Sequence, residues 1–134
     1  NLKVQSRNPK KTYAIDTGFR NANATSGSED RGKLLENLVF LEFRKRGRQL
    51  YYHKDQLECD FVITENYKPT ELVQVTESLK EGAVRKREIE GLKEAMRQYK
   101  LTTGLVITMN EEGFLKEPEG TIKIVSAWSY FAEL

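Results

Sequence analysis

The sequence is poor in residues that build cysteine, histidine or nucleotide sites. Its only cysteine, Cys59, excludes an internal disulfide and a cysteine-rich zinc site. Its only histidine is His53, which argues against a histidine-based metal site and against a Ser-His-Asp triad. We expect this side chain to be solvated at a hairpin tip. There is no Gly-x-x-x-x-Gly-Lys-Ser/Thr run, which predicts no ATP site in this fragment. No secretory segment or long apolar run is present either, so we predict a cytoplasmic protein without a membrane partner.

The 134 residues suffice for one domain with a substantial core. Contents of 38% hydrophobic and 31% charged residues are typical of a soluble globular protein rather than of a disordered tail. The chain begins at Asn1 without a methionine, on a polar segment that has no apolar period. We therefore expect a fragment of a longer protein, with a linker or edge segment at 1–11 and the domain at 12–134.

Hydrophobic periodicity divides the domain into strands and helices. Strands are expected at 12–16, 49–53, 58–63, 72–76, 103–108 and 121–125, where β-branched and aromatic residues dominate. Helices are expected at 31–46, 83–100 and 127–131, and polar loops at 19–30, 66–69 and 110–120. Helices that alternate with strands predict an α/β fold, with a mixed sheet covered by helices on both faces.

The strands at 58–63 and 72–76 contain the first candidate site residues. Alternate side chains of a strand share a face, which predicts Cys59, Phe61 and Ile63 on one face and Asp60 on the other. If the two strands pair with their apolar faces aligned, Asp60 and Gln74 come together near the strand ends. Two oxygen-bearing groups on a buried framework are what a hard divalent cation needs.

Glu36 is a candidate of the same kind on the first helix. It lies one turn before Phe40 and shares that apolar stripe, which would carry its carboxylate toward the interior. A carboxylate there needs a hydrogen bond, a basic residue or a metal as its partner. The alternative is an ordinary glutamate favoured by the helix dipole in the first turns.

Basic residues cluster at 1–11, 44–48 and 85–87, although the net charge is only +2. Such clusters can track the phosphates of nucleic acid. For any one of these clusters, helix ends and solvated faces are the better explanation.

Several segments together resemble a known family. The segments Tyr13-Ala-Ile-Asp-Thr-Gly18, Gly32-Lys-Leu-Leu-Glu-Asn-Leu-Val-Phe40 and Glu58-Cys-Asp-Phe-Val-Ile63, with 87–92 and 104–108, resemble a C-terminal domain of unknown function. That domain follows the AAA-type ATPase core of many bacterial and archaeal ATP-binding proteins. The order of an acidic helix residue, a strand Asp and a neighbouring strand with Glu/Gln-x-Lys is also similar to the PD-(D/E)xK nuclease-like superfamily.

The resemblance implies a restriction-endonuclease-like α/β/α sandwich and an upstream ATPase domain in the same chain. It also implies a site in which Glu36, Asp60 and Gln74 hold Mg²⁺ or Mn²⁺, which would polarise a phosphate and activate a water. Gln74 stands where an acid is expected, and Thr76 where the family has a lysine. Lys80, Arg85 or Arg87 are the candidates to supply a cation and to contact nucleic acid.

Two functions follow from this comparison. In the favoured one, catalysis has degenerated because Thr76 replaces the lysine, and the module binds nucleic acid or protein for its ATPase. In the other, the domain is an active Mg²⁺-dependent DNA endonuclease with a variant site.

Overall fold

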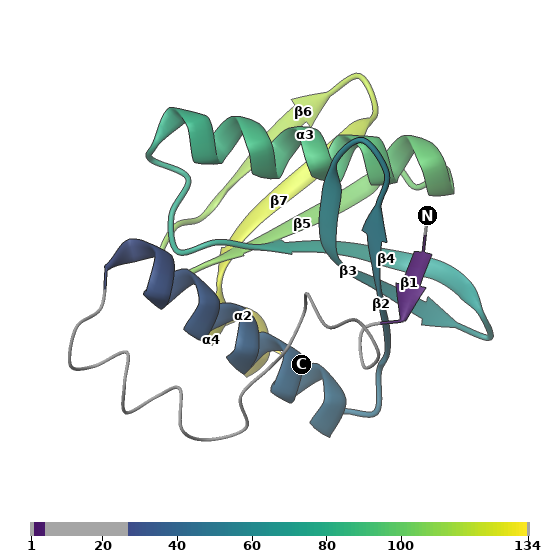
Figure 1. Cartoon of the computed structure of the whole chain (residues 1–134), viewed down its shortest axis with the longest axis horizontal. Coiled ribbons are helices and arrows are strands. Elements are labelled where there is room, and N and C mark those ends of the chain that lie inside the picture. The colour runs from purple at the N-terminus through teal and green to yellow at the C-terminus, as the bar shows by residue number, and fades with distance from the viewer. Residues whose placement is uncertain (1, 5–26, 134) are drawn as a thin grey trace.

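The computed structural model describes residues 2–4 and 27–133, which form seven strands and three helices labelled as in Figure 1. Their order is β1 (Leu2–Val4), α2 (Ser28–Lys45), β2 (Gln49–Lys54), β3 (Glu58–Glu65), β4 (Lys68–Val75), α3 (Gly82–Tyr99), β5 (Thr103–Thr108), β6 (Gly113–Glu117), β7 (Gly120–Ser126) and α4 (Ala127–Ala132). None of these helices has the length and apolar character needed to cross a bilayer. The strand predicted at 12–16 and most of the loop predicted at 19–30 lie outside the described residues.

The strands form one mixed sheet in the order β1-β2-β3-β4-β5-β7-β6. Neighbours from β1 to β4 are antiparallel, β4, β5 and β7 are parallel, and β6 is antiparallel to β7. The helix α3 connects the parallel neighbours β4 and β5, which need a long crossover. The predicted mixed sheet is therefore confirmed. At one edge, Leu2–Val4 of the segment predicted as a linker or edge pairs with β2.

Helices cover both faces of this sheet, as predicted, so the domain has three layers (Figure 1). On one face, the α2 residues Leu35, Val39 and Phe43 are buried against the sheet. The ring of Phe43 meets the ring of Phe61 and that of Phe131 edge-on, each at a centroid distance of 5.6 Å. This face is an apolar core with aromatic contacts between α2, β3 and α4.

The opposite face is covered by α3. Its residues Ile89, Leu92 and Met96 recur at helical spacing and form an apolar stripe that is buried against the sheet. The helix begins at Gly82, where the side chain of Glu81 caps the N–H group of Ala83. Apolar packing of this stripe holds α3 across the middle of the sheet.

Between residues 27 and 133, three elements differ from the prediction by more than two residues. The helix α2 begins at Ser28 instead of Arg31, because polar residues that are common in loops also begin helices. The strand β6 lies inside the loop predicted at 110–120, and its alternating half-buried and exposed residues gave too weak an apolar signal. The loop predicted at 66–69 is a tight turn at Asn66 and Tyr67, both at positive φ, so β4 begins at Lys68, four residues before the predicted start at 72.

The prediction that His53 is solvated is wrong. Its side chain is fully buried between β2 and α3. Its Nδ1 lies 2.8 Å from the hydroxyl of Tyr99, and its Nε2 lies 2.7 Å from Oε2 of Glu94. Glu94 also accepts a hydrogen bond from the N–H group of Leu57, so this network ties the β2–β3 hairpin to α3.

Candidate functional site

A β-bulge in β3 sets the position of Asp60. Tyr51 pairs with Val62 but His53 pairs with Cys59, so Asp60 and Phe61 together face a single residue of β2. The prediction that Cys59 and Phe61 share a face is therefore wrong, because simple alternation assumes an unbroken ladder. Cys59 packs in the core under α3, and Phe61 packs in the core under α2.

At the bulge, side chains replace the ladder hydrogen bonds between β3 and β4. The N–H group of Asp60 donates to Oε1 of Gln74 at 2.8 Å. In return, the N–H group of Val75 donates to Oδ2 of Asp60 at 2.8 Å. The predicted proximity of Asp60 and Gln74 is confirmed. The same two bonds hold the Asp60 carboxylate at the C-terminal end of β4.

Gln74 joins three elements through its amide. It is 2% exposed, and Nε2 donates to the backbone carbonyls of Glu58 at 2.9 Å and Glu88 at 3.0 Å. These partners fix the amide orientation, since only the nitrogen can donate. The helix comes this close because residue 91 is glycine, where a Cβ would lie 2.2 Å from the carbonyl oxygen of Glu58. Gln74 is therefore a structural link between β3, β4 and α3.

Glu36, Asp60 and Gln74 all line one cleft of about 920 Å³. Its other lining residues come from α2, α3, the β2–β3 hairpin, the last residue of β4 and the segment after it: Gly32, Lys33, Lys54, Asp55, Gln56, Leu57, Glu58, Val75, Thr76, Glu77, Ser78, Lys80, Glu81, Val84, Arg87 and Glu88. Glu36 is half-buried there. In the part of the chain that the structure describes, no three His, Cys, Asp or Glu side chains stand close enough together to hold a metal ion.

The cleft contains a buried carboxylate that the sequence prediction missed. Glu88 of α3 is 9% exposed, and among the described residues no hydrogen-bond donor reaches its Oε1. Burial, the nearby carboxylate of Asp60 and, more weakly, that of Glu36 raise the pKa of Glu88 to about 7, although Arg87 opposes this. The signal was present, because Glu88 lies one turn before Leu92 on the α3 stripe, as Glu36 lies one turn before Phe40.

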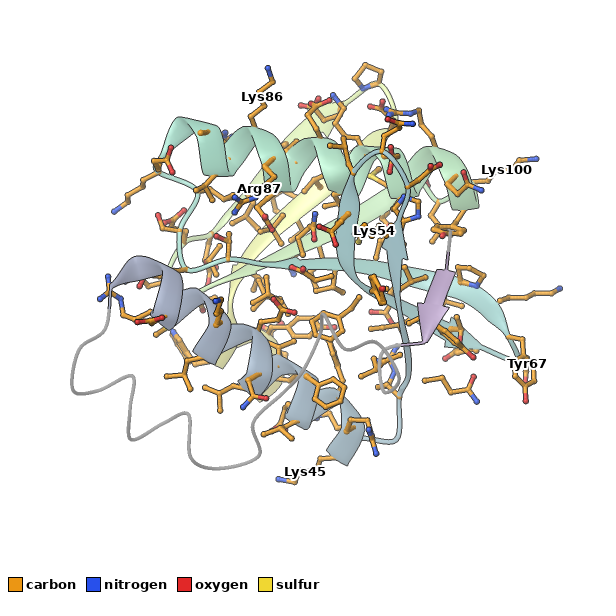
Figure 2. All side chains as sticks on the ribbon, in the orientation of Figure 1. Lys45, Lys54, Tyr67, Lys86, Arg87 and Lys100 are labelled. Atoms are coloured by element: carbon orange, nitrogen blue, oxygen red, sulfur yellow. The ribbon has the colours of Figure 1, made fainter. Side chains whose placement is uncertain are left out.

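Cations from several elements line the same cleft. Of the predicted nucleic-acid contacts, Lys80 and Arg87 line it, whereas Arg85 is exposed outside it. Arg87 Nε donates to Oε2 of Glu88 at 3.2 Å while most of the arginine side chain stays exposed. Figure 2 shows Arg87 on the sheet side of α3 and Lys86 pointing away. Lys33 and Lys54 were not predicted as site residues, because neighbours along the chain do not reveal which distant residues share a cleft.

Fold and site together define a three-layer α/β domain with a carboxylate-rich cleft beside the bulge of its central hairpin. The chain belongs to the family described as DUF4143, a domain of unknown function, whose model matches residues 31–130. It is 38% identical to the uncharacterized protein MJ1544 of Methanocaldococcus jannaschii over 139 aligned positions, which cover 96% of this chain and 30% of that protein. The chain thus spans less than a third of its relative's length. No solved structure matches the chain.

Proposed function

We propose that this domain is the nuclease-like module of a longer AAA-type ATPase, and that it binds nucleic acid through the cleft. One observation carries the proposal: Glu36 of α2, Asp60 of β3 and Gln74 of β4 line a single cleft in a three-layer domain. This is the arrangement that the resemblance to the PD-(D/E)xK superfamily implies, with a restriction-endonuclease-like core. The link to an ATPase is supported by the common occurrence of this family with AAA ATPases and by the greater length of the archaeal relative.

Binding to nucleic acid is supported by the cations at the cleft. Lys33 comes from α2 and Lys54 from the hairpin. Lys80 lies in the segment before α3, and Arg87 lies in the first turns of α3. Cations that converge from separate elements can contact successive phosphates of one strand.

Impaired catalysis is supported by Thr76. Its hydroxyl is a hydrogen-bond donor to the carbonyl of Ser78 at 3.3 Å, and the residue is 9% exposed. A neutral hydroxyl cannot provide the positive charge that a lysine places beside a reacting phosphate. A divalent cation held by Glu36, Asp60 and Gln74 would polarise a phosphate, but it would not replace that lysine.

The other candidate function, an active Mg²⁺-dependent DNA endonuclease, is favoured by Lys33 and Lys54. These ammonium groups belong to the same cleft lining as Asp60, so another part of the chain could supply the cation that Thr76 lacks. Incubating the domain with plasmid and branched DNA plus Mg²⁺ or Mn²⁺ separates the two functions. Cutting that Asp60→Ala abolishes would establish the endonuclease, whereas intact DNA supports a binding module.

The binding proposal is tested with fluorescence anisotropy of labelled duplex and branched DNA at several salt concentrations. Arg87→Gln and Lys80→Gln each remove one cleft cation, so we expect weaker binding and a salt slope smaller by about one. Lys86→Gln is the matched control, because Lys86 is exposed on the same helix and points away from the sheet. Equal effects of all three substitutions, or no binding at all, would contradict the proposal and leave protein binding as the role to test.

A further inference from the structure

Among the residues that the structure describes, the carboxylate of Glu88 has only one hydrogen-bond donor, which is Arg87. Its Oε1 is buried without a hydrogen-bond donor among the described residues, and its Oε2 receives one bond from the mostly exposed Arg87. A buried charge without adequate partners is strongly unfavourable, so such groups are normally paired or coordinate metals. This oxygen therefore marks a position where a positive partner would stabilise the chain.

The surroundings of Glu88 favour a cation over an anion. Among the residues that line the cleft, carboxylates outnumber Lys and Arg by seven to four. Asp60 and Glu36 lie near enough to act electrostatically on Glu88. Concave surfaces with an excess of one charge concentrate ions of the opposite charge, and a cluster of carboxylate oxygens suits a hard divalent cation. The charge of such a cation would offset the negative excess that otherwise opposes the phosphates of nucleic acid.

We propose that Glu88 is the third acidic ligand of a divalent-cation site that it forms with Asp60 and Glu36. This inference rests on the proposed use of the cleft and extends it to a residue outside the family-like set. Glu88 would supply the negative charge that Gln74 cannot. Gln74 would then position the ligands, because its amide holds the N–H group of Asp60 and the carbonyl of Glu88.

Ligation requires a local rearrangement of side chains. The described carboxylates do not yet stand close enough together for three of them to share one ion. Like charges repel one another without a cation between them, and the Glu side chains have three rotatable bonds with which to close on it. The backbone can stay fixed, since Gln74 and the Asp60–Val75 bond already hold the strand and helix that present two of the carboxylates.

The test is a titration of the chain with Mn²⁺ at pH 8, in which free Mn²⁺ is measured by electron paramagnetic resonance. We expect one ion to bind to the unsubstituted chain, Glu88→Gln to weaken its binding at least tenfold, and Asp60→Asn to weaken it similarly. Glu90→Gln is the matched control, because Glu90 lies two residues away on α3, pairs with Lys93 and does not line the cleft. It should bind Mn²⁺ like the unsubstituted chain. Circular dichroism of each variant checks that the chain remains folded.

The results distinguish this inference from the proposed function. If Glu88→Gln binds Mn²⁺ as tightly as the unsubstituted chain while Asp60→Asn loses affinity, Glu88 is not a ligand. The ligands would then be Glu36, Asp60 and Gln74. No Mn²⁺ binding by the unsubstituted chain would overturn the cation site, whereas the DNA anisotropy measurements decide the binding function separately. Glu88→Asp adds a second variant that keeps the charge, and it should retain more affinity than Glu88→Gln.

Discussion

The two faces of the sheet are built on different principles. The face under α2 is closed by apolar and aromatic contacts around Phe43. The face under α3 has an apolar centre around Leu92, but toward the start of the helix it buries Gln74 and Glu88. Burial of apolar groups stabilises the fold, whereas burial of a poorly paired carboxylate opposes it. The proposed site therefore lies at the polar end of the α3 face, where Glu36 of α2 also lines the cleft.

The largest effect is expected where the apolar face is broken. Phe43→Ala removes a fully buried ring, so the free energy of unfolding should fall by about 3–5 kcal/mol in urea titrations. Phe114→Ala is the control, because this ring is 68% exposed on β6, and it should change stability by less than about 0.5 kcal/mol. Mn²⁺ affinity of the folded Phe43→Ala chain should be unchanged, and a loss there would show that the two faces are coupled.

A smaller loss is expected when the polar link of the α3 face is changed. Gln74→Glu replaces an N–H donor with a carboxylate oxygen facing the carbonyls of Glu58 and Glu88, so we expect a loss of about 2–3 kcal/mol at neutral pH. Gln56→Glu makes the same change at an exposed position of the cleft and should have little effect on unfolding. Equal stability of the two variants would mean that the amide of Gln74 is not the link described above.

The smallest effect, and the one of opposite sign, concerns Glu88. Burial, and after it the carboxylate of Asp60, raises the pKa of Glu88 from 4.5 to about 7. The folded chain therefore keeps this proton up to a higher pH than the unfolded chain does. Stability is therefore lost as the pH rises from about 4.5 through 7. Glu88→Gln removes this cost, so its free energy of unfolding should exceed that of the unsubstituted chain. In a metal-free, chelator-containing buffer, this difference should grow by about 1–3 kcal/mol between pH 5 and pH 8.

The matched control for that measurement is Glu90→Gln, compared at the same two pH values by urea unfolding. Glu90 is partly exposed and paired with Lys93, so its substitution should shift stability by less than about 0.5 kcal/mol between them. A gain for Glu88→Gln that stays flat with pH would contradict the burial cost assigned to this carboxylate.

The same contrast explains what could be predicted from the sequence. Apolar stripes on α2 and α3 report burial directly, so the helices, the mixed sheet and the covering of both faces were predicted. The proximity of Asp60 and Gln74 followed from strand pairing. The bulge at Asp60 was not predictable, because one extra residue in a ladder leaves no mark in composition. Glu88 could have been predicted, since the argument applied to Glu36 holds equally for a glutamate one turn before Leu92.

The central claim is that carboxylates from two helices and one bulged strand converge on a single cation. Crystals of the domain grown with Mn²⁺ test it directly through anomalous scattering. We expect one Mn²⁺ peak between the carboxylates of Asp60 and Glu88, with Glu36 turned toward it. A cleft without a peak at saturating Mn²⁺, or an ion bound away from Glu88, would contradict it.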